Sequence, residues 1–259
     1  MRTLKIVLAY DGTNYCGWQY QPDVATVQGT LETAIQSATG RAVRVTASGR
    51  TDSGVHALRQ VASLQIDTTL SDETLYRALS AKLPEDIRIL SVSTVDDSFH
   101  SIRDAVSKRY RYLIQDGGQE DVFYRRFQWF LPKPLDDQAM KTAAEFVRGK
   151  HDFASFESVG SPRQSSVRTV LDISVERQKR EISEAICIEI AADGFLYNMV
   201  RNIVGSLVKI GQGRAEIELI PQLLEERDRK NAGMTAPACG LTLVNVEYAA
   251  STRDGAEEP

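Results

Sequence analysis

The feature that most constrains the fold is a succession of strand-like and helix-like apolar patterns that occurs twice along the 259-residue chain. In the first half, some segments have alternating or continuous apolar residues, which predict strands. The segments between them have apolar residues at helical spacing, which predict helices. Strands are predicted at 3–10, 42–47, 58–66 and 87–94. Helices are predicted from Val27 to Ala38, with Gly40 at the C-terminal cap, and from about Ser71, ended by Pro84. The predicted order is β-α-β-β-α-β.

The second half repeats this order. Its predicted strands cover 108–115, 168–176, 185–192 and 241–248, and its helices cover 136–148 and about 195–210, with a short one near 216–227. Two such units indicate an α+β fold of two ferredoxin-like halves, each with helices on one face of an antiparallel sheet and the other faces free to build a cleft. We expect halves at 1–104 and 105–250 and an acidic flexible tail at 251–259. The polar segment 149–168 predicts a functional or mobile loop.

Composition excludes several classes of protein. No apolar run approaches the roughly 20 residues of a membrane helix, and the N-terminal apolar stretch is too short for a secretory signal, so a cytoplasmic protein without membrane contact is expected. Cys16, Cys187 and Cys239 form no CxxC pair, and the three histidines are isolated, so no metal site is expected. The net charge of −4 argues weakly against a nucleic-acid partner. Basic clusters at 41–44, 108–112 and 125–126 are, taken singly, typical of solvated surface.

The turn "TASGRTDSGVHALRQ", residues 46–60, places Asp52 and Arg50 between Gly49 and Gly54. The spacing resembles a phosphate-binding loop, but Val and His follow where that loop needs Lys and Ser or Thr, so a P-loop NTPase is excluded. Asp52, Ser53 and His56 are too close in sequence to aim at one another as a triad. Two interpretations stay open: an Asx-turn in which Asp52 caps its own backbone, or a nucleophile or base kept ionised by a neighbouring guanidinium.

Two further segments combine apolar and polar faces. Tyr110, Tyr112 and Ile114 share one face of a predicted strand, which alone is typical of core. On the predicted helix at 195–210, Arg201 belongs to a polar side opposite the apolar stripe, together with Asn198, Asn202, Gly205 and Lys209. Asn and Gly are poor helix formers for a solvated face, so this side is expected to line the cleft.

The motif "GRTDSGVHA" resembles the signature "GRTDxGVHA" of the tRNA pseudouridine synthase A (TruA) family. Other blocks are similar to the family in the same order along almost the whole chain: "YDGTNYCGWQYQP", "TVQGTLETAI", "SFHSIRDAVSKRYRY", "HDFASF", "FLYNMVRNIVGSL" and "APACGLTLVNVEY". The resemblance implies an isomerase that converts uridine to pseudouridine at nucleotides 38, 39 and 40 of the tRNA anticodon stem-loop, without a cofactor. It also implies a pseudouridine synthase type mixed sheet with a central cleft, and a homodimer.

The resemblance also implies roles for four residues. Asp52 matches the catalytic aspartate, and Arg201 matches an arginine that pairs with it. Arg50 matches an arginine that helps extrude the target nucleotide, and Tyr110 matches the tyrosine that stacks on the target base. Tyr112 stays structural. The chain departs from the family at 101–103, where many relatives read Ala-Arg-aromatic and this chain reads Ser-Ile-Arg, so an RNA-contacting arginine would have moved by one residue.

Two other functions stay open. A non-catalytic RNA-binding module would fit ferredoxin-like sheets that carry aromatic residues, but such a module would not need the aspartate that is present here. A carboxylate-based glycosidase or nucleosidase normally needs two acids that flank the bond, and no second acid lies near Asp52 in the sequence.

Overall fold

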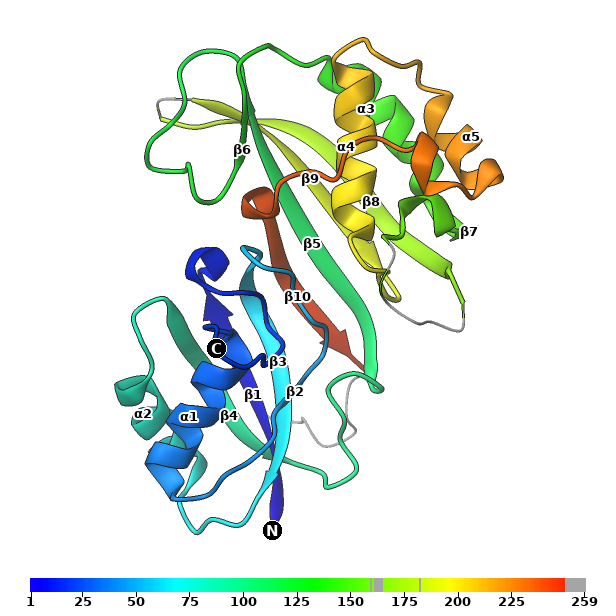
Figure 1. The fold of residues 1–259 in the computed structure, drawn as a ribbon. Helices are drawn as coiled ribbons and strands as arrows, with labels where there is room; N and C mark the ends of the chain where they lie inside the picture. Colours follow the sequence, from blue (N-terminus) through cyan, green and yellow to red (C-terminus); the bar gives the residue numbers. More distant parts are fainter. Residues whose placement is uncertain (159, 161–164, 182, 250–259) are drawn as a thin grey trace.

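The computed structural model describes residues 1–158, 160, 165–181 and 183–249 (Figure 1). The tail predicted at 251–259 lies outside these residues, as does part of the predicted loop 149–168. The strands are β1 (Arg2–Tyr10), β2 (Thr46–Ala47), β3 (His56–Ile66), β4 (Ile87–Val95), β5 (Ala105–Asp116), β6 (Trp129–Leu131), β7 (Gly149–Asp152), β8 (Val167–Lys179), β9 (Glu184–Ala192) and β10 (Leu241–Tyr248).

All ten of these strands, within the part of the chain described, form one sheet. The order is β4-β1-β3-β10-β5-β9-β8-β7, with β2 beside β3 and β6 beside β5. In the first half, the four strands lie in the order β4-β1-β3-β2, and in the second half the order β10-β5-β9-β8 repeats it. A short parallel pairing of β10 with β3 joins the halves, while the other long pairings are antiparallel. The predicted α+β fold of two ferredoxin-like halves in one mixed sheet is confirmed.

The helices begin and end where local chemistry satisfies their ends. They are α1 (Val27–Thr39), α2 (Asp72–Lys82), α3 (Asp137–Ala144), α4 (Met199–Gly211) and α5 (Leu219–Glu226). Side chains of Thr26, Ser71 and Asp136 cap the first three, and Gly40 ends α1 in the left-handed conformation, as predicted. Short 3-10 turns cover Gly12–Asn14, Glu145–Val147, Ala154–Phe156, Arg229–Asn231 and Ala238–Gly240. Among the described helices, none combines the length and apolar character that crossing a bilayer requires.

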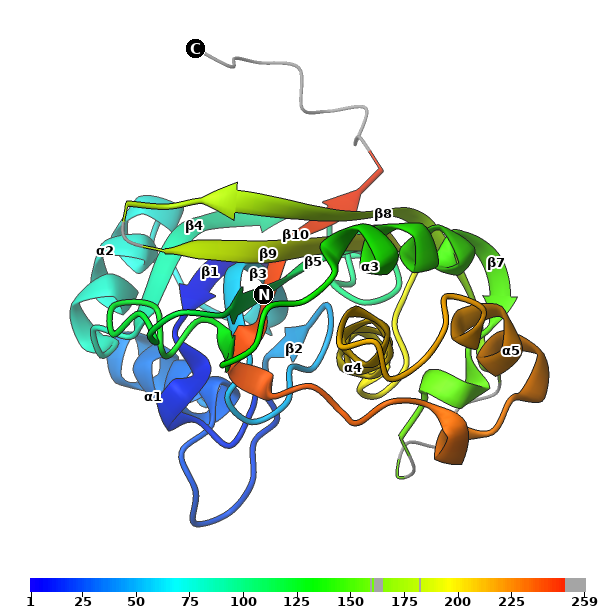
Figure 2. The ribbon, with the colours of Figure 1, turned by 90° about the horizontal axis from the view of Figure 1, so that it is seen from above.

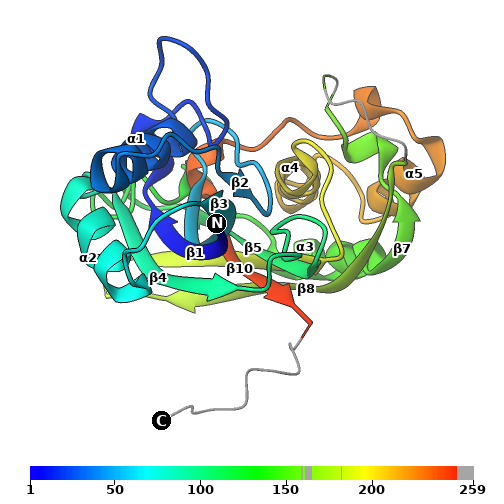
Figure 3. The same cartoon turned by 90° about the horizontal axis from the view of Figure 1, so that it is seen from below.

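The helices of both halves lie on the same face of the sheet (Figures 2 and 3). One group, α1 and α2, covers the first half, and the other, α3 to α5, covers the second. We expected the helix-free faces to line the cleft. Instead, the polar residues of the candidate site meet on the helix-bearing face, between the two groups of helices. The expectation was wrong because residues 48–55 leave the sheet on the side of α4 (Figure 2).

Several element boundaries differ from the prediction. The strand predicted at 42–47 is reduced to β2, because side chains of α1 bind the backbone of Val45: Glu32 accepts from its amide at 2.8 Å and Gln28 donates to its carbonyl at 3.1 Å. The helix predicted from 195 begins at Met199, since Asn198 has a left-handed φ of 60°. The short strands β6 and β7 were not predicted, and β7 lies inside the segment 149–168 that was expected to be a loop.

Candidate active site

The loop that carries Asp52, residues 48–55, packs against the segment that follows β1. A Cβ atom at Gly17, whose φ is +86°, would lie 2.7 Å from the carbonyl oxygen of Thr51. The backbone amide of Trp18 donates to the same oxygen at 3.0 Å. Two backbones approach this closely only because glycine has no side chain. The position of the aspartate is therefore fixed by a neighbouring loop and not by its own turn alone.

The carboxylate of Asp52 does not cap its own turn. The turn is closed by the backbone, with the amide of Val55 donating to the carbonyl oxygen of Asp52 at 3.1 Å and Gly54 at φ +78°. Within the described residues, the carboxylate accepts no hydrogen bond from a backbone N–H. The Asx-turn interpretation is therefore wrong, and the charged oxygens face a different partner.

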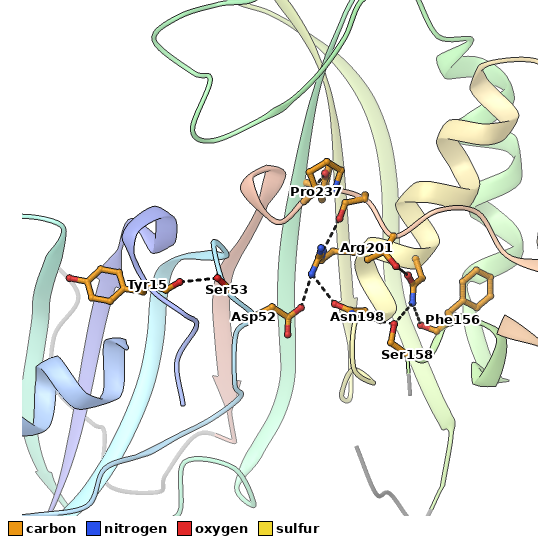
Figure 4. Close-up of polar contacts among 12 residues, drawn as sticks. Tyr15, Asp52, Ser53, Phe156, Ser158, Asn198, Arg201 and Pro237 are labelled. Carbon is orange, nitrogen blue, oxygen red and sulfur yellow. Dashed lines mark hydrogen bonds and ion pairs between the residues drawn. The ribbon is translucent and has the colours of Figure 1, made fainter. Parts of the chain in front are cut away.

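That partner is Arg201, on the first turn of α4. Its Nη1 donates to Oδ2 of Asp52 at 3.1 Å, and the two side chains are 17% and 26% exposed. The same guanidinium donates from Nη1 to the side-chain oxygen of Asn198 at 2.9 Å and from Nε to the carbonyl oxygen of Ala236 at 2.7 Å. Figure 4 shows Asp52 and Arg201 pointing toward each other from the two halves of the chain. The structure thus brings together the two residues that the sequence analysis paired.

Burial and charge act in opposite directions on Asp52. Desolvation raises the pKa of its carboxyl group above the ordinary value, and the charge and hydrogen bond of Arg201 partly offset this rise. The sequence analysis expected a neighbouring guanidinium on the same turn to keep the acid ionised. The supporting charge comes instead from α4.

Tyr110 lies on the helix-bearing face of β5 and is 7% exposed. Its ring meets Phe195 edge to face at 5.1 Å. Burial raises the pKa of Tyr110, and the charge on Asp52 raises it further, so the phenol stays neutral at physiological pH. Tyr112, two residues on, is fully buried and donates its hydroxyl to the carbonyl oxygen of Pro237 at 2.7 Å, which agrees with the structural role predicted for it.

Arg50 is exposed on the loop that carries Asp52. Its guanidinium makes no hydrogen bond or ion pair with any of the described residues. An unpaired guanidinium beside a carboxylate can contact an anionic ligand without first breaking an internal bond. The nucleotide-extruding role of Arg50 stays a prediction.

Ser53 and His56 do not form a triad with Asp52. The hydroxyl of Ser53 donates to the backbone oxygen of Tyr15 at 3.2 Å. The buried ring of His56 accepts from the amide of Gly12 at 3.0 Å through Nδ1 and lies 3.2 Å from a backbone oxygen through Nε2. The exclusion of a hydrolase triad, which rested on sequence spacing, is confirmed by these contacts.

The arginine at 103, which the sequence analysis considered as a displaced RNA contact, is held by its own loop. Its Nη2 donates to the carbonyl oxygen of Ser98 at 2.8 Å, and its Nε donates to Asp104 at 3.3 Å. The preceding Ile102 is half exposed, and Ser101 is fully buried with its hydroxyl bonded to the backbone of Thr46. The departure from the family pattern therefore leaves this arginine in a structural contact.

Sequence reasoning missed the roles of Asn198 and Ala236. Asn198 bonds Arg201 through its oxygen and Ser158 through its amide at 3.0 Å (Figure 4). The sequence pattern that could have identified Asn198 is an asparagine directly before a helix, because asparagine tolerates the left-handed conformation better than most residues. Ala236 contacts Arg201 only through its backbone, for which the sequence offers no local signal.

The polar side of α4 is also only partly open. We expected all of it to line the cleft, but Asn202 is 0% exposed and Gly205 is in contact with the backbone of Met234. The segment 228–237 covers both residues. Arg201 alone reaches Asp52 from this side within the described chain.

The arrangement can provide a carboxylate that is shielded from water and held by a guanidinium. Such a group can add covalently to an electrophilic carbon or accept a proton from carbon. Among the described residues, no three His, Cys, Asp or Glu side chains gather in a group that would hold a metal ion. The chemistry offered by this site is therefore that of Asp52, with Arg201 and Tyr110 beside it.

The chain matches the model of one protein family, described as tRNA pseudouridine synthase, over residues 6–103 and 143–249. It is 45% identical to the tRNA pseudouridine synthase A of Acetivibrio thermocellus over 248 residues. It is 46% identical to the same enzyme of Moorella thermoacetica over 250 residues, and 43% identical to that of Thermoanaerobacter sp. (strain X514) over 248 residues. Each match covers 96% of this chain and 100% of the relative.

Proposed function

Because this chain belongs to the tRNA pseudouridine synthase family, we propose that it isomerises uridine to pseudouridine at nucleotides 38, 39 and 40 of the tRNA anticodon stem-loop, with Asp52 as its catalytic group. The observation that carries the proposal is the ion pair of 3.1 Å between Arg201 and Asp52. A shielded carboxylate on a glycine-framed loop, held by a guanidinium from the other half of the chain, is a group that can react with a base once it has left its stack.

The reaction is an isomerisation and is redox neutral. The N1–C1′ bond breaks, the uracil turns, and a C5–C1′ bond forms, while the proton on C5 leaves and N1 takes up a proton. Nothing is oxidised or hydrolysed overall, so no cofactor is required. A carboxylate suffices, by adding to the base, by adding to the sugar, or by removing a sugar proton. The geometry of Asp52 is compatible with all three routes.

The positions of the neighbouring residues support a role for each of them. Arg201 keeps Asp52 ionised and oriented against the effect of burial. Arg50, exposed and unpaired within the described chain, supports the distorted RNA after the target nucleotide leaves the stack, which costs a few kcal/mol. Tyr110 offers its ring to the target uracil. The half at 1–104 supplies Asp52, and the half at 105–250 supplies Arg201.

We further propose that the protein acts in the cytoplasm as a homodimer in which each tRNA contacts both subunits. An exposed apolar cluster in the loop between β5 and β6 supports a protein contact: Val122, Phe123 and Tyr124 are exposed, and Phe123 is 77% accessible. Burying such side chains is favourable by roughly 1.5–3 kcal/mol each. Light scattering at working concentration tests this part; a monomer with full activity contradicts it.

The test of the main proposal is release of tritium from tRNA that contains 5-tritiated uridine. Pseudouridine formation replaces the hydrogen on C5 and releases the label, so time-dependent release equal to the pseudouridine formed is expected. A non-catalytic RNA-binding module binds the tRNA and releases nothing. A nucleosidase, which needs a second acid that Asp52 lacks among its partners in the described chain, releases labelled uracil instead of tritiated water.

A further inference from the structure

The segment 228–237 crosses α4 on the side away from the sheet (Figures 1 and 2). Its backbone touches the helix directly, because a Cβ atom at Gly205 would lie 1.7 Å from the carbonyl oxygen of Met234 and one at Gly233 would lie 2.5 Å from that of Gly205. The amide of Gly233 also donates to the side chain of Ser206 at 3.0 Å. The two glycines let the segment lie against α4 without intervening side chains. We call it the α4 strap.

The α4 strap holds Arg201 by two hydrogen bonds. The amide of Ala236 donates to the carbonyl oxygen of Arg201 at 3.1 Å, and the Nε of Arg201 donates to the carbonyl oxygen of Ala236 at 2.7 Å. The second bond sets the plane in which the guanidinium lies and thereby aims Nη1 at Asp52. Movement of residue 236 would turn the guanidinium away from the carboxylate.

Arg229 fixes the α4 strap to the helix. Its Nη2 donates to the side-chain oxygen of Asn202 at 2.8 Å and to the hydroxyl of Thr235 at 2.9 Å, and its Nη1 donates to the carbonyl oxygen of Gly233 at 3.0 Å. The hydroxyl of Thr235 donates to the same oxygen of Asn202 at 2.7 Å. Asn202 is fully buried and is anchored from its amide to the backbone of Phe156 at 2.8 Å. These bonds tie both ends of the α4 strap to the residue that follows Arg201.

The choice of arginine at this place needs an explanation. All three acceptors of Arg229 are neutral, and within the described residues it has no carboxylate partner. Desolvation lowers the pKa of its guanidinium. A partly buried cation without a counter-ion costs stability, and the three hydrogen bonds to neutral acceptors offset that cost only in part. A planar fork that reaches three acceptors at fixed angles gives directional control that a lysine or an apolar residue does not.

We propose that Arg229 is a positioning residue for the isomerisation, which clamps Thr235 to Asn202 and so holds Ala236 where it orients Arg201 against Asp52. The inference rests on the proposed function. It predicts that loosening the α4 strap impairs the chemical step and changes the ionisation of Asp52, while the binding of tRNA, which depends mainly on phosphate contacts, is kept.

The experiment compares Arg229→Ala with Arg227→Ala, which removes an exposed guanidinium that is paired with Asp152 and has no hydrogen bond or ion pair with α4 among the described residues. Pseudouridine formation is measured in a single turnover at enzyme excess across the pH range, with filter binding of tRNA at each pH. For Arg229→Ala we expect a loss of at least about tenfold in rate, tRNA affinity within about threefold, and an acid limb displaced to higher pH. Arg227→Ala should resemble the unmodified chain.

The displacement of the acid limb is the result that a purely structural role would not produce. The charged or titratable groups that interact with Asp52 are Arg201 from α4 and Tyr110 from β5, while Arg50, two residues earlier on the same loop, is exposed; the charge and hydrogen bond of Arg201 lower the carboxyl pKa. If Arg201 is no longer held, that effect weakens and the rate falls at a higher pH. A slower variant with an unmoved acid limb overturns the proposal.

A second pair of variants covers the case in which Arg229→Ala does not fold. Thr235→Val keeps the shape of the side chain but removes the hydroxyl that bonds Arg229 and Asn202, whereas Thr235→Ser keeps the hydroxyl. We expect a slower reaction and a displaced acid limb in the first and near-normal behaviour in the second. Equal behaviour of the two overturns the proposal. Absence of pseudouridine with the unmodified chain would contradict the proposed function instead.

Discussion

The guanidinium of Arg201 donates to the carboxylate of Asp52 at 3.1 Å, although the two residues are 149 positions apart in the sequence. One comes from a loop of the first ferredoxin-like half and the other from the first turn of α4 in the second half. The pair therefore exists only when the two halves are joined through β3 and β10.

Arg201→Lys should lose at least about tenfold in the single-turnover rate although it keeps the positive charge. The arginine uses Nη1 and Nε in fixed directions for Asp52 and for the carbonyl of Ala236, and a lysine ammonium is a point charge on a flexible stem. Rate and tRNA affinity are measured together, with thermal unfolding as the control for folding. A lysine variant with an unchanged rate would assign the pair to structure alone.

Tyr110→Phe should fold and bind tRNA nearly normally. The hydroxyl makes no hydrogen bond within the described residues, and the ring contact with Phe195 does not depend on it. Any loss in rate then reports what the hydroxyl does beside Asp52. The comparison is Tyr110→Ala, which also removes the ring and should weaken stacking on the base by roughly 1–3 kcal/mol. Equal rates in the unmodified chain, Tyr110→Phe and Tyr110→Ala would show that Tyr110 has only a structural role.

The rate should fall on the acid side at a higher pH than an ordinary aspartate would give. The reaction needs the ionised carboxylate, and burial raises the pKa of Asp52 more than Arg201 lowers it. Protonation therefore begins at a higher pH as the solution is acidified, and the rate declines with it. The single-turnover rate is measured against pH, with tRNA binding followed at each point. A flat profile down to the ordinary range of aspartate would disprove the shift.

The features of the fold and of the site that depend on residues close together in the sequence could be predicted. The sequence predicted a turn that carries Asp52 between Gly49 and Gly54, and the turn is present with Gly54 at positive φ. The repeated apolar patterns predicted the order of strands and helices, because the spacing of apolar residues can be read within each short segment of the sequence. The helical period predicted that Arg201 lies opposite the apolar stripe.

The contacts that place the site depend on long-range packing and were not predictable from local patterns. The backbone of Val45 is bound by side chains of α1, which shortens β2. Ala236 orients Arg201 through a carbonyl oxygen, which every residue type possesses. The burial of Asn202 depends on a segment about 30 residues further along the chain.

Gly17→Ala should impair catalysis more than its cost in stability explains. The new methyl group would overlap the carbonyl oxygen of Thr51 and displace the Asp52 loop. The matched control is Gly213→Ala, whose φ is also positive but which has nothing within 4 Å. The control should lose about 1–2 kcal/mol of stability and no activity. Urea unfolding and single-turnover rates are compared; equal rates in the two variants would show that the loop contact does not position Asp52.

The central claim is that the carboxylate of Asp52 performs the chemistry, and Asp52→Asn tests it most directly. The asparagine keeps the size and hydrogen-bonding capacity of the side chain but removes the charge and the nucleophile. Pseudouridine formation and filter binding of tRNA are measured at enzyme excess, and mass spectrometry excludes deamidation back to aspartate. We expect no pseudouridine and a tRNA affinity within about tenfold, or roughly 1.4 kcal/mol, of the unmodified chain. Appreciable pseudouridine from the verified asparagine variant would contradict the account.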